Sequence, residues 1–452
     1  MRVTLIKDRS FYRNVLSIML PVALQAAINM GVNMLDTMML GSFGEAQLSA
    51  SSLANQFYSF FLIFCYGIIG GSSVLASQYW GARDKDHVRE TFSMALRIAI
   101  GVALVFAALT LFFTRPIMKI YTSEEDVINC GVKYLKITVL IFAIHGTGLV
   151  AAQLMRTVGQ AKLGLYVSIL SFAINLAANY IFIFGKCGMP RMEIAGAALG
   201  TLIARLTEFL ATFIYILVMD KKLGFRLKHL LKAPSIQFYK NYLRLGAPVL
   251  LSDALLGLGL NLLSVVLGHM GAAVVAANSI CQVIDRLCTV VIQGVSNASG
   301  IITGNTIGSG NRDLAMKQGE TFYLLSMIFG AIASVMVFVL GPMTISMYSL
   351  APETVTMTRQ LMNAYVVIIF FEAIQCVMTK GVLRGGGDTR FLLKADILFM
   401  WLVSIPLGAV GGLLLHWPAW LTLLCLRIDY IIKSFWCVSR LLSGKWIHSV
   451  ET

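Results

Sequence analysis

One carboxylate stands at the end of the first long apolar stretch of the chain. Asp36 follows an uncharged run from Asn14 to Leu35, and Asn29 and Asn33 precede it at helical spacing. A charged side chain within a membrane span is costly unless it is protonated, paired or facing a polar cavity. We therefore take Asp36 as the first candidate for binding and releasing a proton or another cation. The alternative is a carboxylate at a helix end, since two glycines follow closely.

Amides and hydroxyls further along the chain could join this carboxylate. Asn175 and Asn179 lie four residues apart in one predicted helix, and Ala197 and Thr201 have the same spacing in the next. Residues at that spacing share a helix face. Together with a carboxylate, their oxygens could ligate a hard cation such as Na⁺. The alternative role for the amides is hydrogen bonding between helices.

The C-terminal half places further carboxylates at or near membrane depth. They are Asp253, Asp285, Glu372 and Asp396. Asp285 is followed directly by Arg286, and we interpret both as members of structural ion pairs. Asp396 is expected to open a span, where the positive end of a helix favours a carboxylate that has no part in coupling.

Large soft side chains surround the first candidate site in the sequence. Met30, Met34 and Phe60, together with Asn33, could line a cavity that adapts to flat organic cations, although ordinary packing is the common role of such residues. His145 is interpreted as a hydrogen-bonded core residue. The glycine-rich segment RGGGDTR lacks the Gly-Lys-Ser/Thr of a phosphate loop, so ATP-driven pumping is not expected.

The composition requires that these residues be positioned by membrane helices. Of 452 residues, 58% are hydrophobic and 13% are charged, with a mean hydropathy of +0.78. About twelve apolar stretches are long enough to cross ~30 Å of hydrocarbon. The period-two alternation of a barrel is absent. The chain is therefore predicted to be an all-α integral membrane protein with twelve transmembrane helices.

The distribution of basic residues predicts the orientation. The formal charge of +14 comes mainly from Lys and Arg near the N-terminus and in alternate loops. This pattern is typical of loops that stay in the cytoplasm, so both termini are expected there in a multi-pass protein of the cell membrane. The bilayer, and not a nucleic acid, is then the expected partner of these charges.

An internal repeat divides the chain into two halves. A shift of 227 residues places Pro21 on Pro248, Gly81 on Gly308 and several other residues on their equivalents without a gap. Transporters commonly contain such repeats, with the transport path between them. We predict an N-lobe at 1–219 with spans one to six, and a C-lobe at 241–452 with spans seven to twelve. The basic segment 220–240 is predicted to be a cytoplasmic amphipathic linker.

Three segments resemble the multidrug and toxic compound extrusion (MATE) transporters. They are NMLDTMMLGSFG from Asn33 to Gly44, AINLAANYIFIFG followed by EIAGAALGT, and EAIQCVMTKGVLRGGGDTR from Glu372 to Arg390. The resemblance covers nearly the whole chain. It implies two pseudo-symmetric six-helix bundles that face each other in a V. It also implies export of small, amphipathic or cationic organic compounds by antiport with H⁺ or Na⁺.

The resemblance also carries over site residues. The family's N-lobe cation site matches Asp36, Asn175 and Thr201, but Asn179 stands where sodium-binding members tend to have Asp. Glu372 falls where one branch of the family has a cation-binding Asp. The partner of that Asp in span seven would be near Leu256, whereas the carboxylate here is Asp253, about one turn away. All six candidates are predicted to take part in cation coupling: Asp36, Asn175, Asn179, Thr201, Glu372 and Asp253.

Two other functions are compatible with parts of the sequence. A flippase for a lipid-linked oligosaccharide would have the same two-lobe plan, but it would need a strongly basic central cavity. An intramembrane enzyme would need a catalytic constellation at one depth, and the six histidines are scattered. We therefore expect a transporter that is not an enzyme, acts as a monomer on a small-molecule substrate, and needs no cofactor besides the coupling ion.

Overall fold

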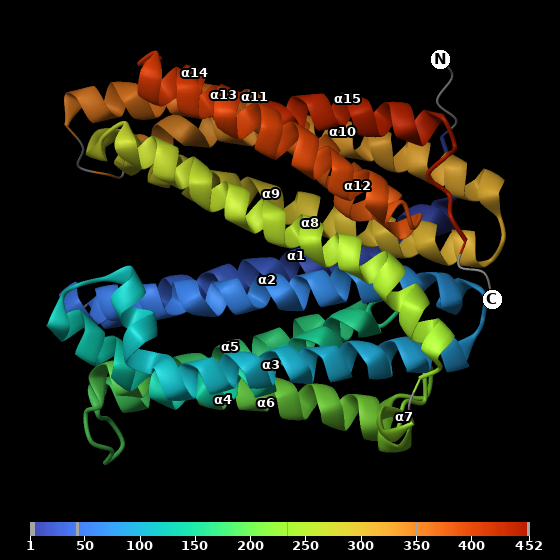
Figure 1. The fold of residues 1–452 in the computed structure, drawn as a ribbon, viewed down its shortest axis with the longest axis horizontal. Coiled ribbons are helices and arrows are strands. Elements are labelled where there is room, and N and C mark those ends of the chain that lie inside the picture. Colours follow the sequence, from blue (N-terminus) through green and yellow to red (C-terminus); the bar gives the residue numbers. More distant parts are fainter. Residues whose placement is uncertain (1–4, 42–44, 233, 347, 349–350, 450–452) are drawn as a thin grey trace. The chain divides into compact units, whose positions relative to one another are not determined.

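A computed structural model describes residues 5–41, 45–232, 234–346, 348 and 351–449 (Figure 1). These residues are almost entirely helical, and no strand occurs among them. The last three residues of the segment quoted around Asp36, positions 42–44, lie outside the described part. The predicted all-α class is confirmed.

The chain forms two compact units. The N-unit consists of Leu24–Ser72 and Lys85–Lys240, and the C-unit consists of Met1–Ala23, Ser73–Asp84 and Asn241–Thr452. The start of the first helix and the end of the second thus belong with the C-terminal half. The predicted lobe boundaries at 219 and 241 stay a prediction.

The N-unit contains four long helices and parts of two more. Its helices are α3 (Lys85–Tyr121), α4 (Glu125–Met155), α5 (Ala161–Phe184), α6 (Glu193–Ile214) with the π-helical turn η1 (Tyr215–Met219), and the short α7 (Leu227–Leu231), together with parts of α1 (Arg9–Gly41) and α2 (Glu45–Gly81). α4 packs against α3 and α6, and α5 packs against α6. Phe61, Phe106 and Phe142 meet at ring distances of 5.1 to 6.0 Å and fill the core between α2, α3 and α4.

The C-unit repeats this plan with more interruptions. Its helices begin with α8 (Ile236–His269), whose first five residues belong to the N-unit, followed by α9 (Ala272–Gly308), α10 (Arg312–Ser346) and α11 (Pro352–Cys376) with η2 (Val377–Leu383). Then come α12 (Thr389–Asp396), η3 (Ile397–Ser404), α13 (Ile405–Ala409) and η4 (Val410–Leu414) in one succession, and finally α14 (Ala419–Leu426) and α15 (Ile428–Leu442). α9, α10 and α11 pack on one another, and α11 also contacts α14 and α15.

Eleven helices of the described residues are long and apolar enough to cross a membrane. The twelfth candidate is interrupted at Arg427, which separates α14 from α15. A charged side chain and a non-helical backbone at one position thus break the last apolar segment into two shorter helices. With this interrupted helix, the described part of the chain supplies the twelve helical segments that the sequence predicts.

The internal repeat is visible in the backbone. Pro21 lies inside α1 and Pro248 inside α8, at positions related by the repeat. Gly159 and Gly387, which the repeat also relates, both have positive φ, +75° and +82°. Only glycine adopts this conformation without steric cost. The two halves therefore share local geometry as well as residue types.

The last turns of α2 and α9 touch within the C-unit through glycines that the repeat relates. A Cβ on Gly81 would overlap the backbone of Asn305, and a Cβ on Gly308 would overlap the backbone of Gln78. Each glycine thus lets the helix of the other half approach to backbone contact. Residues 73–84 belong with the C-terminal half because of such contacts.

Side-chain hydrogen bonds to backbone groups hold the segment between the halves in place. Asp220 accepts hydrogen bonds from the backbone N–H groups of Lys222, Leu223 and Gly224 at 3.0 to 3.1 Å, and from the side chain of Gln160. From α3, the Arg89 guanidinium donates to Leu223 O at 2.9 Å. The short helix α7 lies in this segment and packs against α3.

One histidine of this segment supports α7. The Arg226 N–H donates to Nδ1 of His229 at 2.9 Å. Partial burial, followed by the nearby Arg89 charge, lowers the pKa of His229 below its usual range. The imidazole is therefore neutral near pH 7, as the accepting nitrogen requires.

Candidate functional site

Three of the predicted site residues form one hydrogen-bonded group between α1 and α5. The Asn179 amide donates to Asp36 Oδ1 at 2.5 Å and to Asn175 Oδ1 at 3.3 Å. Asn175 and Asn179 are buried at 4% and 0% exposure. The helical spacing noted in the sequence places both amides on the face of α5 that meets Asp36.

A glycine in α6 makes room for this group. A Cβ at Gly200 would overlap Oδ1 of Asn179, so only glycine fits there. That amide oxygen is buried and accepts no hydrogen bond among the described residues. It remains available to a proton donor or to a cation. Gly200 was not among the predicted site residues, although it follows several small residues in α6.

Thr201 lies beside the group without a hydrogen bond to Asp36 in the described contacts. Its hydroxyl donates to Ala197 O at 2.9 Å, one turn back in α6. Tyr134 of α4 has Thr201 and Asn55 as polar neighbours, and it lies close enough to Asp36 for an electrostatic interaction. The structure thus brings Asp36, Asn175 and Asn179 together and places Thr201 one side chain away, next to Tyr134.

A second charged cluster in the N-unit was not predicted. Arg205 pairs with Glu208 at 2.7 Å on α6, and the other Glu208 oxygen lies 4.0 Å from His145 Nε2. His145 is hydrogen-bonded to the Tyr58 hydroxyl, in agreement with its interpretation as a core residue. The Arg205 charge also acts on Asp36. The spacing of Arg205 and Glu208 by three residues inside a span was the available signal.

Three of the four predicted cavity residues lie on α1, the helix that carries Asp36, and the fourth lies on α2. Met30, Asn33 and Met34 belong to α1, and Met34 is exposed. Phe60 on α2 meets the rings of Phe64 and Phe106 and stays 42% exposed. A role for these four residues in lining a substrate cavity stays a prediction.

Asp253 and Glu372 occupy different environments in the C-unit. Arg384 donates to both carboxylate oxygens of Asp253, at 2.7 and 3.1 Å. Such a forked pair compensates the charge of Asp253 directly. Glu372 lines a cavity to which Asp253 does not contribute. The two carboxylates therefore do not form one site in this structure.

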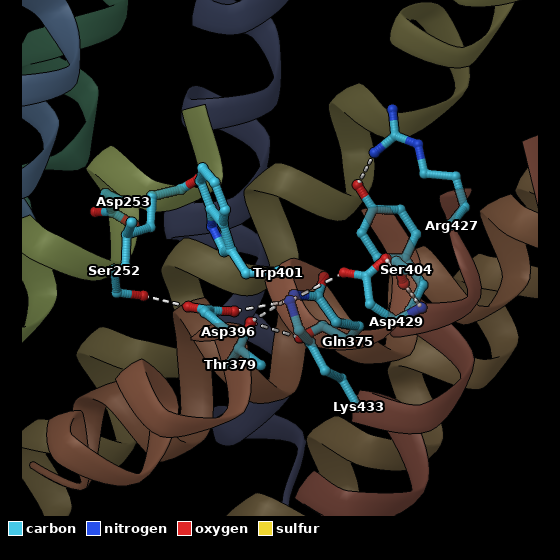
Figure 2. Close-up of polar contacts among 12 residues, drawn as sticks. Ser252, Asp253, Gln375, Thr379, Asp396, Trp401, Ser404, Arg427, Asp429 and Lys433 are labelled. Carbon is cyan, nitrogen blue, oxygen red and sulfur yellow. Dashed lines mark hydrogen bonds and ion pairs between the residues drawn. The ribbon is translucent and has the colours of Figure 1, made fainter. Parts of the chain in front are cut away.

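Figure 2 shows a buried lysine between two carboxylates. The Lys433 ammonium lies 2.8 Å from Asp396 and 3.0 Å from Asp429, and all three side chains are at most 5% exposed. Ser252 donates to Asp396, and Ser404 donates to Asp429 at 3.4 Å. The expectation that Asp396 opens a span is wrong: it ends α12 and continues into η3, where Lys433 from α15 compensates its charge.

The cavity at Glu372 also contains Asp285, Arg286 and Arg427. Its volume is about 290 Å³. Asp285 and Arg286 form no ion pair among the described residues, so the expectation of structural pairs is not met. Their side chains line the cavity from α9. Sequence reasoning missed this role because it compared Asp285 only with its chain neighbour.

Comparisons with known proteins agree with this architecture. A family model described as MatE matches residues 21–181 and 248–410, which are the two halves of the repeat. The "Probable multidrug resistance protein NorM" of Thermotoga maritima is 25% identical over 443 residues, which cover 96% of this chain and 93% of the relative. The "Multidrug resistance protein MdtK" of Photorhabdus laumondii is 23% identical over 407 residues and covers 89% of this chain and 88% of its own.

Solved structures share the fold at low sequence identity. A "MOP superfamily transporter from Pyrococcus furiosus" has a TM-score of 0.85 at 17% identity and covers 96% of this chain and 97% of its own. An outward-facing "multidrug resistance MATE family transporter" has a TM-score of 0.85 at 16% identity, covering 98% and 99%. The fold is that of a multi-pass helical membrane transporter with two six-helix halves. The chain belongs to the MatE family, the MATE transporters that its sequence resembles.

Proposed function

We propose that this protein exports small amphipathic or cationic organic compounds by antiport with protons or sodium ions. Single copies in the cell membrane, with both termini in the cytoplasm, would carry out the cycle. Relatives described as multidrug resistance proteins support the substrate class. The observation that carries the proposal is the hydrogen-bonded group of Asp36, Asn179 and Asn175.

This group can respond to a cation. Asp36 supplies one negative charge, and the free oxygen of Asn179 supplies a further ligand. Sodium prefers oxygen donors of this kind, and a proton needs only the carboxylate. Thr201 and Asn175 could complete the ligand set for Na⁺, which is here transported cargo and not a resident cofactor.

Cation binding would change which conformation is stable. Neutralising Asp36 removes the cost of closing apolar helix surface over a carboxylate. The first span can then repack, and the bound compound leaves to the outside. Release of the cation inside restores the charge and the state that accepts new substrate. An ion can shift such an equilibrium only through its different affinity for the two states, and Asp36 provides that difference.

The test is export driven by one gradient at a time. Efflux of a fluorescent cationic dye from vesicles is measured under a proton gradient and, separately, under a sodium gradient. Asp36→Asn keeps the size of the side chain but fixes it as neutral. We expect this variant to insert and fold normally, to bind the dye, and to lose roughly 90% or more of gradient-driven export, a loss equivalent to ~1.4 kcal/mol or more in the driven step.

Glu353→Gln is the matched control, because Glu353 is an exposed carboxylate in the first turn of α11. It should export at the rate of the parent. Full export by Asp36→Asn under the same gradient would place coupling elsewhere, with Glu372 the next candidate.

A further inference from the structure

The cavity of the C-unit combines both signs of charge in one small space. Asp285 and Arg286 enter it from α9, Glu372 from α11, and Arg427 from the break between α14 and α15. Its volume of about 290 Å³ is near the lower end of the range for small-molecule pockets, ~300 Å³. The cavity lies wholly within residues 260–430 of the C-unit.

The opposite charges in this cavity do not pair with each other. Among the described residues, no ion pair joins Asp285, Glu372 or Arg427 to any partner, and the nearest hydrogen bond of Arg427 goes to the Tyr430 hydroxyl. Oδ1 of Asp285 and Nε of Arg427 are both buried and have no hydrogen-bond partner in the part of the chain that the structure describes. Burying unsatisfied charged groups is costly, so a ligand that satisfies them would be favoured.

Neighbouring charges are already compensated. Arg384 is paired with Asp253, and Lys433 lies between Asp396 and Asp429. Figure 2 shows Arg427 apart from Lys433, and the Arg427 guanidinium donates to the Tyr430 hydroxyl. The cavity therefore keeps Arg286 and Arg427 as its own cations, with Asp285 and Glu372 as its carboxylates.

Apolar and aromatic side chains line the rest of the cavity. Leu260, Leu267 and Leu423 provide hydrocarbon, and Tyr365 is held in place by donating to Asn278 Oδ1 at 3.1 Å. A ligand would thus meet an apolar wall between a guanidinium and a carboxylate.

We propose that this cavity binds a small zwitterionic compound with an apolar middle. Its anionic group would contact Arg427, and its ammonium group would contact Asp285. A guanidinium is suited to carboxylates and phosphates because its donors form a fork. This site goes beyond the proposed antiport, since it assigns a ligand class to the C-terminal half. Glu372, the alternative coupling residue, is part of its lining, whereas Asp36 is not.

The test measures binding by the full-length protein in phosphatidylglycerol nanodiscs, without a gradient. The probes are phenylalanine and 4-(aminomethyl)benzoic acid, which carry their two charges at short and long separation. For each, the methyl ester removes the negative charge and the N-acetyl form removes the positive charge. We expect at least one zwitterion to bind about tenfold more tightly than both of its blocked forms, because each blocked form loses one charged hydrogen bond. No binding by either zwitterion, or equal binding of all forms, would overturn the proposal.

Two variants test which side chain contacts each charged group of the ligand. Arg427→Gln should weaken the zwitterion about tenfold and leave the methyl ester unaffected, and Asp285→Asn should weaken the zwitterion and leave the N-acetyl form unaffected. Arg359→Gln, which changes an exposed arginine of α11, is the control and should bind as the parent does. If Arg427→Gln weakened every form equally, the contact with the anionic group would be contradicted.

A third variant keeps the test valid if a charge substitution prevents folding. Ser264→Phe fills the cavity without altering any charge, so it should weaken all bound forms together. Unchanged zwitterion binding in Ser264→Phe would place the probes elsewhere and would overturn the assignment.

A lipid headgroup with a phosphate and an ammonium has the same chemistry as the probes. Adding phosphatidylethanolamine to the nanodiscs distinguishes the two sources. Loss of probe binding on its addition would identify the lipid as the zwitterion, and unchanged binding would identify a soluble compound. Both results presuppose that the zwitterion binds more tightly than its blocked forms in pure phosphatidylglycerol. If it does not, the proposal is contradicted.

Discussion

At the scale of residues, Asn179 holds the candidate coupling group together. One amide contacts Asp36 on α1 and Asn175 on α5, and it packs against Gly200 on α6. Its position is therefore fixed by three helices. Replacing this amide with a charged group of the same size would act directly on Asp36 and leave the packing nearly unchanged.

Asn179→Asp should alter the ion dependence of export. The substitution places a second carboxylate within hydrogen-bonding distance of Asp36, and two negative charges attract a cation more strongly than one. Coulomb's law at this separation gives several kcal/mol, so half-maximal stimulation by sodium should move to an at least about tenfold lower concentration. Dye efflux measured against sodium concentration and pH gives this value.

The double variant Asp36→Asn with Asn179→Asp is the control for this prediction. In this protein the single carboxylate stands at residue 179 and the amide at residue 36. Part of the cation response should therefore return relative to Asp36→Asn. An unchanged ion and pH profile in a transporting Asn179→Asp variant would place residue 179 outside the coupling site.

The sequence allowed part of this site to be predicted. Helical spacing within one span put Asn175 and Asn179 on a common face, and the cost of an intramembrane charge singled out Asp36. Contacts between helices distant in the chain could not be obtained this way. The meeting of His145 with Glu208, and the position of Asp285 and Arg427 around one cavity, depend on helix rotation and packing that no local spacing encodes.

At the scale of elements, the linker is fixed by one buried carboxylate. Asp220 is 1% exposed and accepts three backbone N–H groups of the turn that follows it. The sequence predicted a basic amphipathic segment lying on the membrane surface. It did not predict this anchor, because Asp220 stands at the end of an apolar run and gives no capping pattern.

Asp220→Ala should release the linker. Loss of the acceptor leaves buried N–H groups unsatisfied, which costs roughly 1–3 kcal/mol. Trypsin should then cleave after Lys221 or Lys222 several-fold faster in the variant than in the parent, yielding two fragments near half the size of the chain. Asp220→Asn, which retains one acceptor oxygen, should lie between the two. Equal cleavage rates in all three proteins would show that Asp220 does not hold the turn.

Interruptions of the helices were harder to predict than the helices. Apolar length indicates where a span lies, because the membrane thickness sets it. It does not indicate where the α-helical hydrogen bonds change to the π-helical ones of η2 and η3. It also does not indicate that Arg427 divides the last span. Nor does it indicate the tertiary contacts made at these places, such as the ion pair of Lys433 with Asp396 at the start of η3.

At the scale of the whole molecule, the proposed orientation can be tested with one native and one introduced cysteine. All eight cysteines lie among the described residues, and Cys187 is the exposed one. It follows α5 in the loop that the basic-residue pattern places outside. Lys228 is exposed in α7, which that pattern places inside.

A membrane-impermeant maleimide should therefore label Cys187 in intact cells. It should label Lys228→Cys, in a Cys187→Ser background, only in inverted vesicles. The Cys187→Ser protein without the second change is the blank in both preparations. Labelling of both positions from one side would contradict the predicted topology.

The crossing of α2 and α9 predicts an unusual response to small substitutions. An added methyl at Gly81 or Gly308 meets the backbone of the other helix, which cannot move aside as a side chain can. Each Gly→Ala change should destabilise the protein by about 1–3 kcal/mol. Gly101→Ala is the control, because no atom lies near its Cβ position, and alanine there should be neutral or stabilising. Thermal unfolding in detergent compares the three variants.

The same crossing has a consequence during biosynthesis. The end of α2 leaves the ribosome well before the residues of α9 that it contacts, since Gly81 meets Asn305, 224 residues later, and Gln78 meets Gly308, 230 residues later. At ~5–20 residues per second, this partner is missing for roughly ten to fifty seconds. Throughout that interval the helix face around Gly81 lacks the α9 backbone that covers it in the folded protein. Residues 73–84 can therefore join the C-unit only after α9 has been synthesised. If the ribosome stalls between the two halves, α2 is left without this partner.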